Sequence, residues 1–222
     1  NLMSLLIFVN YINVKWRVKE LPKLKLILIT MNNKKYTGYG TFQYKKGEYT
    51  GEIVENKCQG FGTMKFGNYD IYEGDWTEGK MHGVGKYMFW NEKKDKYTQT
   101  YEGQFNFGVR EGKGTMIYTN HDVYTGYWQN NMRTGEGICV FADGKCFHGI
   151  WKFNKMIRGV MCFPDGNKYD GDFKDGKLEG YGKFYWNDGN WFEGVFKEGK
   201  PWNGILLTPE GKITEFVDGV MK

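Results

Sequence analysis

The chain has 222 residues, of which 40% are hydrophobic and 18% aromatic, and its formal net charge is +5. Residues 1–30 carry +4 of this charge, so the rest of the chain is nearly neutral and its acids and bases are interspersed. Affinity for nucleic acid rises with the number of phosphates that a basic face neutralises, so this distribution predicts no nucleic-acid partner.

Residues 1–35 are predicted to form a short N-terminal extension. Its apolar runs, residues 2–9 and 24–29, flank a basic segment, and neither approaches the ~20 apolar residues of a membrane-spanning helix. No positive region precedes the first run, as a secretory signal requires. Three interpretations stay open. The first is a helix or strand that packs on the first repeat or on a partner. The second is a basic amphipathic segment that acts in targeting or lies on a membrane surface, with residues 1–30 in weak contact with acidic lipid. The third is an artefact of the gene model upstream of Met31.

Through residues 36–222 an aromatic-x-Gly-x-aromatic pattern recurs about every 23 residues. Its copies begin at Tyr72, Tyr101, Tyr124, Phe147, Tyr169 and Phe192, with a weaker first copy at Tyr49. Self-similarity at a fixed period indicates one small structural unit that is stacked many times. Such an array offers a long surface and no deep pocket, which favours binding over catalysis.

Each copy is predicted to be a β-hairpin. Alternate side chains of a strand point to one side, so Tyr72, Gly74 and Trp76 share a face. A polar turn with Gly or Asn follows, and a Gly-x-Gly triplet opens a second alternating run that ends at an Asp-Gly turn in several copies. The lysine-rich residues 92–99 interrupt the period and are predicted to form a protruding loop, while the aliphatic last unit is predicted to cap the array.

Glycine inside a strand weakens it, so its recurrence at fixed places needs a physical reason. We expect large rings from one strand to lie across the neighbouring strand, where only a residue without Cβ leaves room. The aromatic contacts offset the loss, because each is worth ~0.5–1.5 kcal/mol beyond its area burial. The glycines interpreted as structural are Gly74, Gly83, Gly85, Gly103, Gly112, Gly114, Gly126, Gly135, Gly137, Gly171, Gly180 and Gly182.

The sequence lacks the patterns of catalytic and metal sites. The four cysteines contain no Cys-x-x-Cys pair and the three histidines do not cluster with them, so no metal site and no cofactor are predicted. The Gly-x-Gly triplets recur along the array and precede no predicted helix, which argues against a phosphate-binding loop. No nucleophile, base or metal is held at one place, so no catalytic residue is assigned and the chain is predicted not to be an enzyme. Free thiols fit a reducing compartment.

These units resemble the MORN repeat family (membrane occupation and recognition nexus), whose pattern is YxGxW, a short turn, HGxGxxxY and a closing Asp-Gly turn. The most similar copy runs from Tyr72 to Gly85 and includes His82, and the likeness covers residues 36–219. The resemblance implies an all-β fold, an elongated single-layer twisted antiparallel sheet of tandem β-hairpins. About seven repeats, a C-terminal cap and a groove along one face are expected.

The resemblance also implies a non-catalytic scaffold or adaptor that binds a protein partner, as a helix or an extended segment, along an aromatic groove. Aromatic residues dominate interface energetics, and the candidate anchors are Tyr72, Trp76, Tyr101, Phe105, Tyr124, Trp128, Trp151 and Tyr169. For any one of these rings, packing between hairpins is the alternative. From the resemblance alone we expect a cytoplasmic, cytoskeletal location, in the axoneme of a cilium or flagellum.

Two other functions stay open. Tethering of membranes through acidic lipid needs a basic stripe, and only residues 1–30 and the loop at residues 93–96 supply one. Wall repeats that bind glucan or choline also use Trp, Tyr and Gly periods, but the doubled Trp-Tyr-Tyr runs expected of them are missing.

Overall fold

The computed structural model describes residues 35–222, and these form one antiparallel sheet of 17 strands. The predicted N-terminal extension lies outside the described residues, so its interpretations and its boundary near residue 35 stay predictions. The strands are β1 (Gly38–Tyr44), β2 (Gly47–Val54), β3 (Lys57–Phe66), β4 (Ile71–Thr77), β5 (Lys80–Asn91), β6 (Lys96–Asn106), β7 (Val109–Ile117), β8 (Val123–Gln129), β9 (Met132–Val140), β10 (Cys146–Lys152), β11 (Lys155–Cys162), β12 (Lys168–Lys174), β13 (Lys177–Tyr185), β14 (Trp191–Lys197), β15 (Lys200–Leu207), β16 (Ile213–Val217) and β17 (Val220–Met221).

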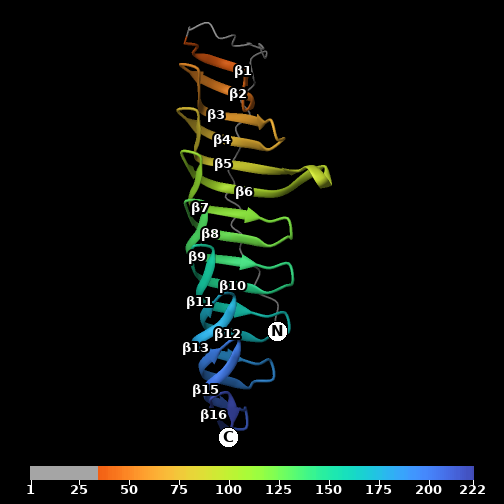
Figure 1. Cartoon of the computed structure of the whole chain (residues 1–222), viewed down its shortest axis with the longest axis vertical. Coiled ribbons are helices and arrows are strands. Elements are labelled where there is room, and N and C mark those ends of the chain that lie inside the picture. The colour runs from red at the N-terminus through yellow and green to blue at the C-terminus, as the bar shows by residue number, and fades with distance from the viewer. Residues whose placement is uncertain (1–34) are drawn as a thin grey trace.

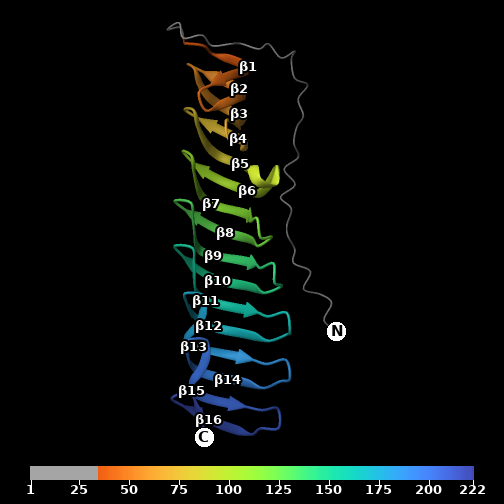
Figure 2. The ribbon, with the colours of Figure 1, turned by 45° about the vertical axis from the view of Figure 1, so that its right-hand side comes forward.

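Each strand pairs with the strands next to it in sequence, so the order in space follows the chain from β1 to β17 (Figure 1). The strands lie across the long axis of an open, single-layer ladder that twists along its length (Figure 2). The predicted elongated sheet of tandem hairpins is confirmed. No helix within residues 35–222 is long and apolar enough to cross a membrane.

Two kinds of turn alternate along the chain and define the two edges of the sheet. Along the short-turn edge two residues join the strands and both have positive φ, as at Asn130 (48°) and Asn131 (65°). This is the type I′ geometry, whose twist matches that of the paired strands. Along the long-turn edge most connections have four or five residues, such as residues 118–122 between β7 and β8.

Phenylalanine is the first residue of two type I′ turns that the sequence pattern predicted to be polar, and the expected glycine or asparagine follows it as Gly108 or Asn154. Phe107 has φ 45° and Phe153 has φ 49°, and their side chains are 50% and 61% exposed. Bulky residues rarely adopt positive φ, because Cβ approaches the following carbonyl oxygen. The flanking strands therefore impose the turn geometry on these residues.

The predicted loop at residues 92–99 is for the most part a lengthened hairpin. β5 and β6 extend beyond their neighbours and are joined through a short 3-10 helix, Glu92–Lys94 (Figure 1). Trp90 packs edge to face on Tyr97 with ring centroids 5.0 Å apart, and Tyr97 Oη donates to Tyr69 O at 3.2 Å. The segment protrudes as predicted, but cross-strand ring pairing keeps much of it in strands.

Candidate partner-binding face

A continuous row of edge-to-face ring contacts, here called the ring column, runs along one face of the sheet. Neighbouring ring centroids are 5.0–5.4 Å apart, and their planes make angles of 77–89°. This is the geometry that the quadrupoles of aromatic rings favour. In order of contact, the ring column consists of Tyr49, Trp76, Tyr72, Phe105, Tyr101, Trp128, Tyr124, Trp151, Phe147, Phe173, Tyr169, Phe196, Phe192 and Phe216.

All eight candidate anchors lie in the ring column and are buried. Their exposed fractions do not exceed the 6% of Phe105, and Tyr72, Tyr101, Tyr124 and Tyr169 are fully buried. The structure gives Tyr72, Trp76, Tyr101, Phe105, Tyr124, Trp128, Trp151 and Tyr169 the packing role that the sequence left as the alternative. A direct role for these rings in binding stays a prediction.

The polar ends of these rings are bonded within the sheet. Tyr72 Oη donates to Asp75 O at 2.9 Å and Tyr101 Oη to Gln104 O at 3.0 Å. Trp128 Nε1 donates to the carbonyl of Gly114 at 3.0 Å. Burial raises the pKa of the Tyr72 and Tyr101 hydroxyls, so both stay protonated near neutral pH. The hydroxyls of Tyr72 and Tyr101 therefore fix the hairpins.

Eight of the twelve glycines interpreted as structural provide the clearance that we predicted. Gly126 and Gly137 are directly opposite each other, and the Tyr124 ring lies over both. A Cβ on Gly126 would lie 2.5 Å from Tyr124 Oη and 2.6 Å from Gly137 Cα, so no side chain fits without displacing backbone. The same arrangement holds at Gly74, Gly85, Gly103, Gly114, Gly126, Gly137, Gly171 and Gly182.

The other four glycines have a different reason, which the sequence did not show. Gly83, Gly112, Gly135 and Gly180 have φ values of 63°, 83°, 60° and 71°. The pairing register shifts beside each of them, as between Gly74 and Trp76 where β4 meets β5. The first glycine of the triplet therefore supplies a left-handed backbone conformation at a bulge, and the second supplies clearance.

Two rows of partly buried side chains flank the ring column on the same face. Beside the long turns lies the aromatic rim, which consists of Phe66, Tyr87, Phe89, Tyr118, Phe141, Phe163, Phe184 and Trp186. Beside the short turns lies the second rim, which consists of Met81, Arg110, Arg133, Met156 and Leu178. Because these rims keep part of their surface in solvent, they are the side chains of this face that a partner can reach.

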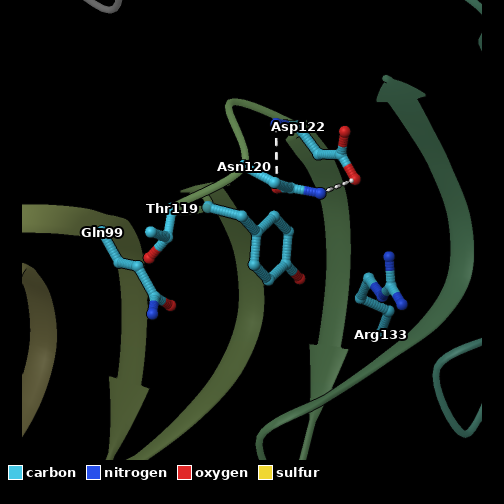
Figure 3. A pocket seen from close by; sticks show the side chains of 6 residues that line it. Gln99, Thr119, Asn120, Asp122 and Arg133 are labelled. Atoms are coloured by element: carbon cyan, nitrogen blue, oxygen red, sulfur yellow. Dashed lines mark hydrogen bonds between the residues drawn. The ribbon is translucent and has the colours of Figure 1, made fainter. Parts of the chain in front are cut away.

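A polar hollow of about 360 Å³ lies between the aromatic rim and the second rim near the middle of the ladder. Gln99, Tyr118, Thr119, Asn120, Asp122 and Arg133 line it. Figure 3 shows the Asn120 side chain bonded to Asp122, with Arg133 across the hollow from Gln99. Asn120 Nδ2 donates to Asp122 Oδ2 at 2.8 Å, and Asp122 Oδ1 accepts from Ala142 N at 2.8 Å. The hollow thus combines fixed polar groups with one cationic side chain.

The opposite face of the sheet carries polar residues mixed with single exposed apolar residues. Val84, Ile150 and Tyr181 are 52%, 48% and 53% exposed, and Ile138 on β9 is 37% exposed. These apolar residues stand apart from one another and do not form a continuous row of contacts like the ring column. The two faces of the sheet therefore differ in how their apolar side chains pack as well as in their composition.

No group of three or more metal-ligating side chains occurs within residues 35–222. Of the four cysteines, Cys58 and Cys139 are buried. Burial raises the pKa of the Cys58 thiol to about 11 and that of the Cys139 thiol to about 12. These two thiols are therefore protonated, packed groups near neutral pH.

The sequence reasoning missed Asp70, a carboxylate that is only 8% exposed. Its oxygens accept from Trp90 N at 2.7 Å, Tyr87 Oη at 2.9 Å and Asn68 Nδ2 at 2.8 Å. It thus ties the turn before β4 to the extended hairpin. A sequence signal for this role was available, because most long turns end with Asp or Asn. Asp122 and Asn167 also accept a hydrogen bond from a backbone N–H about 20 residues further on.

The geometry defines the class of protein as an open, single-layer array of β-hairpin repeats with an aromatic face. Six segments match the family model for the MORN repeat, at residues 30–48, 49–71, 72–89, 101–123, 124–146 and 169–191. These segments make up more than half of the chain, so the chain belongs to the MORN repeat family. The units that begin at Phe147 and Phe192, which lack the Gly-x-Gly triplet, are outside the matched segments.

The chain is similar to parts of two curated relatives. It is 35% identical over 82 residues to MORN repeat-containing protein 3 of Xenopus laevis, which is 36% of this chain and 34% of that protein. It is 30% identical over 92 residues to Alsin of Rattus norvegicus, which is 41% of this chain and 6% of that protein. The match therefore spans about a third of the first relative and a small part of the second.

Among solved structures, the G-box domain of the microcephaly protein CPAP gives a TM-score of 0.48 at 13% identity, covering 83% of this chain and 97% of that one. The TCP domain of Drosophila melanogaster SAS-4, solved with a proline-rich motif of Ana2, gives a TM-score of 0.44 at 16% identity, covering 71% of this chain and 84% of that one.

Proposed function

We propose that this chain is a non-catalytic scaffold that binds a protein partner along the face that carries the ring column. The observation that carries the proposal is the aromatic rim, a row of partly exposed rings that runs from Phe66 to Trp186. Aromatic side chains with one accessible side on a rigid support are the usual anchors of protein interfaces. The ring column beside them is packed within the sheet, so little conformational freedom is lost on binding.

The spacing of the aromatic rim suits a partner that lies along the ladder. Equivalent rim residues of adjacent repeats, such as Tyr118 and Phe141, are two strands apart, about 9.6 Å. Three residues of an extended polyproline II segment, which return a side chain to the same side, cover about 9.3 Å, and two turns of a helix cover about 10.8 Å. A helix or an extended segment with apolar residues at such intervals would meet successive rim positions.

Photo-crosslinking from the two faces tests the proposal. The full chain would carry p-benzoylphenylalanine at Phe141 on the aromatic rim or at Ile138 on the opposite face, and both variants would be irradiated in cell extract. We expect protein adducts at position 141 that are absent at position 138, identified by mass spectrometry. No adduct at 141, or the same adducts at both positions, would contradict binding along this face.

The location in a ciliary, flagellar or other cytoskeletal assembly belongs to the same proposal and rests on the family resemblance. Imaging of the tagged full chain tests it, and a uniform distribution through the cell would count against it. The alternative, tethering through acidic lipid, depends on residues 1–30 and on the loop at residues 93–96. Flotation of the full chain with phosphatidylserine vesicles tests that alternative, with phosphatidylcholine vesicles as the control for charge.

A further inference from the structure

Arg110 and Arg133 occupy the same place in adjacent repeats of the second rim, 23 residues apart. Each guanidinium lies against the ring column, with Arg110 Cζ 4.7 Å from the Trp128 centroid and Arg133 Cζ 4.3 Å from the Trp151 centroid. Each Nη2 also donates to a backbone carbonyl of the next short turn, at 3.2 and 3.0 Å. Both planar groups are therefore held in fixed orientations before any partner binds.

Neither guanidinium has a carboxylate partner within residues 35–222. The acidic residues near them in the sequence bind other groups. Glu111 accepts from Asn130 N at 3.0 Å, Asp122 accepts from Ala142 N at 2.8 Å, and Glu136 lies 3.2 Å from the His148 ring nitrogen. The Nε of Arg133 is buried and has no hydrogen-bond partner. Buried charges are normally paired with an opposite charge, and buried donors are normally hydrogen-bonded. The guanidinium groups of Arg110 and Arg133 therefore lack an anionic partner.

The fold itself does not require a charge at this position. The equivalent residues of other repeats are Met81, Met156 and Leu178, which pack against the same ring column. Arg133 also borders the polar hollow, where Gln99 and Tyr118 can donate hydrogen bonds. Burial raises the pKa of the Tyr118 hydroxyl, so it remains a donor near neutral pH.

We propose that Arg133, together with the hollow beside it, and Arg110 bind two side-chain carboxylates of an acidic segment in a protein partner. This inference rests on the proposed function and specifies the chemistry of the partner. The two guanidiniums lie two strands apart, about 9.6 Å. This matches acidic residues three apart in a polyproline II segment, where every third side chain points to the same side at intervals of about 9.3 Å. Planar guanidinium groups bind carboxylates through paired hydrogen bonds, which fixes the register of the partner along the ladder.

The surroundings favour a carboxylate over a phosphate or a membrane. Asp122 lines the hollow and Glu111 follows Arg110, so a doubly charged phosphate would meet more repulsion than a singly charged carboxylate. Attraction to an acidic membrane depends on a cluster of several basic residues, and the second rim supplies only these two arginines.

The four arginines of the chain allow a direct test by nuclear magnetic resonance of the Nε–Hε groups in ¹⁵N-labelled full chain. The probe is the capped peptide acetyl-Glu-Ala-Ala-Glu-amide, with the Gln-Ala-Ala-Gln peptide and inorganic phosphate as controls at constant ionic strength. We expect saturable shifts of the Arg110 and Arg133 signals with the Glu peptide alone. The Arg158 signal should stay in place, because that guanidinium pairs with Asp172 at 3.0 Å.

Arg133→Met copies the residue found in other repeats, so we expect it to keep the fold and to weaken binding of the Glu peptide about tenfold, as loss of one charged hydrogen-bonded pair does. Arg133→Lys should give an intermediate loss, because it keeps the charge and loses the paired geometry. An equal response to the Gln peptide, tighter binding of phosphate, or no saturable shift at Arg133 would each overturn the proposal. If the Glu peptide does not bind while protein crosslinks form at position 141, the proposal of an acidic partner segment is wrong and the proposed scaffold function stands.

Discussion

At the scale of single residues, this sheet depends on places where a side chain is missing. Gly126 and Gly137 bring two backbones together beneath the Tyr124 ring, whose hydroxyl then reaches Tyr127 O at 3.0 Å. The ring can lie over this part of the sheet only because Gly126 and Gly137 lack Cβ. One glycine pair therefore positions one ring of the ring column and, through it, the next repeat.

Gly126→Ala is expected to destabilise the protein by about 3 kcal/mol, because the new Cβ would meet backbone that has nowhere to move. Gly67→Ala is the matched control, since its Cβ would find only Lys46 O, at 3.8 Å, and its φ is not left-handed. Urea denaturation followed by tryptophan fluorescence measures both. Equal stabilities of the two variants would contradict the clearance explanation.

Phe153→Asn is expected to stabilise the protein by about 1 kcal/mol, because Asn adopts positive φ at a lower cost than Phe. The repeat before it already has Asn130 at the equivalent place with φ 48°, against 49° for Phe153. Little packing is lost, as the Phe153 ring is 61% exposed. Thermal unfolding of the variant beside the parent chain measures the change. A lower midpoint would mean that the Phe153 ring makes contacts that outweigh the backbone strain.

At the scale of elements, the alternation of residues was enough to predict hairpins, their faces and their turns. It did not predict how deeply the rings are buried, because alternation shows to which side Tyr101 points and not what covers it. The cover comes from Arg110 on the second strand of the same hairpin and from Trp128 of the next hairpin. The bulges at Gly83 and its equivalents were missed for a similar reason. The Gly-x-Gly pattern does not show which of its two glycines provides clearance and which has a left-handed backbone at a bulge.

The extended hairpin of β5 and β6 depends on Asp70, which sequence patterns did not single out. Asp70→Ala would leave Trp90 N and Tyr87 Oη without their acceptor, and such losses cost about 1–3 kcal/mol for each buried group. We expect faster hydrogen exchange at Trp90 and a lower midpoint of unfolding. Asp143→Ala is a control on an exposed turn, where the carboxylate pairs with the exposed Lys145, and it should change stability little. Similar effects of the two substitutions would contradict the role of Asp70.

At the scale of the whole molecule, every strand pairs only with its neighbours along the chain. Stability should therefore be close to a sum of local terms, as in other repeat arrays. The ring column links the repeats in series, because each of its rings contacts the rings before and after it. A substitution that destabilises one repeat is then expected to destabilise the next repeat as well, by an amount that falls with distance along the array.

Hydrogen exchange of Gly126→Ala measured by mass spectrometry tests this expectation. We expect faster exchange in β7 to β10, with protection in β2, β3, β14 and β15 close to that of the parent chain. The physical reason is that, within residues 35–222, each strand pairs only with its neighbours along the chain, so the middle of the ladder is linked to its ends through the intervening repeats. A uniform rise over all strands would show that the array unfolds as one cooperative unit.

The difference between the two edges has a consequence for how such a chain changes length and acquires new parts. A two-residue type I′ turn has no spare residue, whereas the β5 to β6 connection adds residues that project outwards while the flanking strands keep their pairing. Insertions, tags or whole folded modules should be tolerated at the tip near Asp95, and the same peptide placed between Asn130 and Asn131 should disrupt pairing. The ladder can thus serve as a ruler that displays grafted groups along one side at intervals of about 9.6 Å.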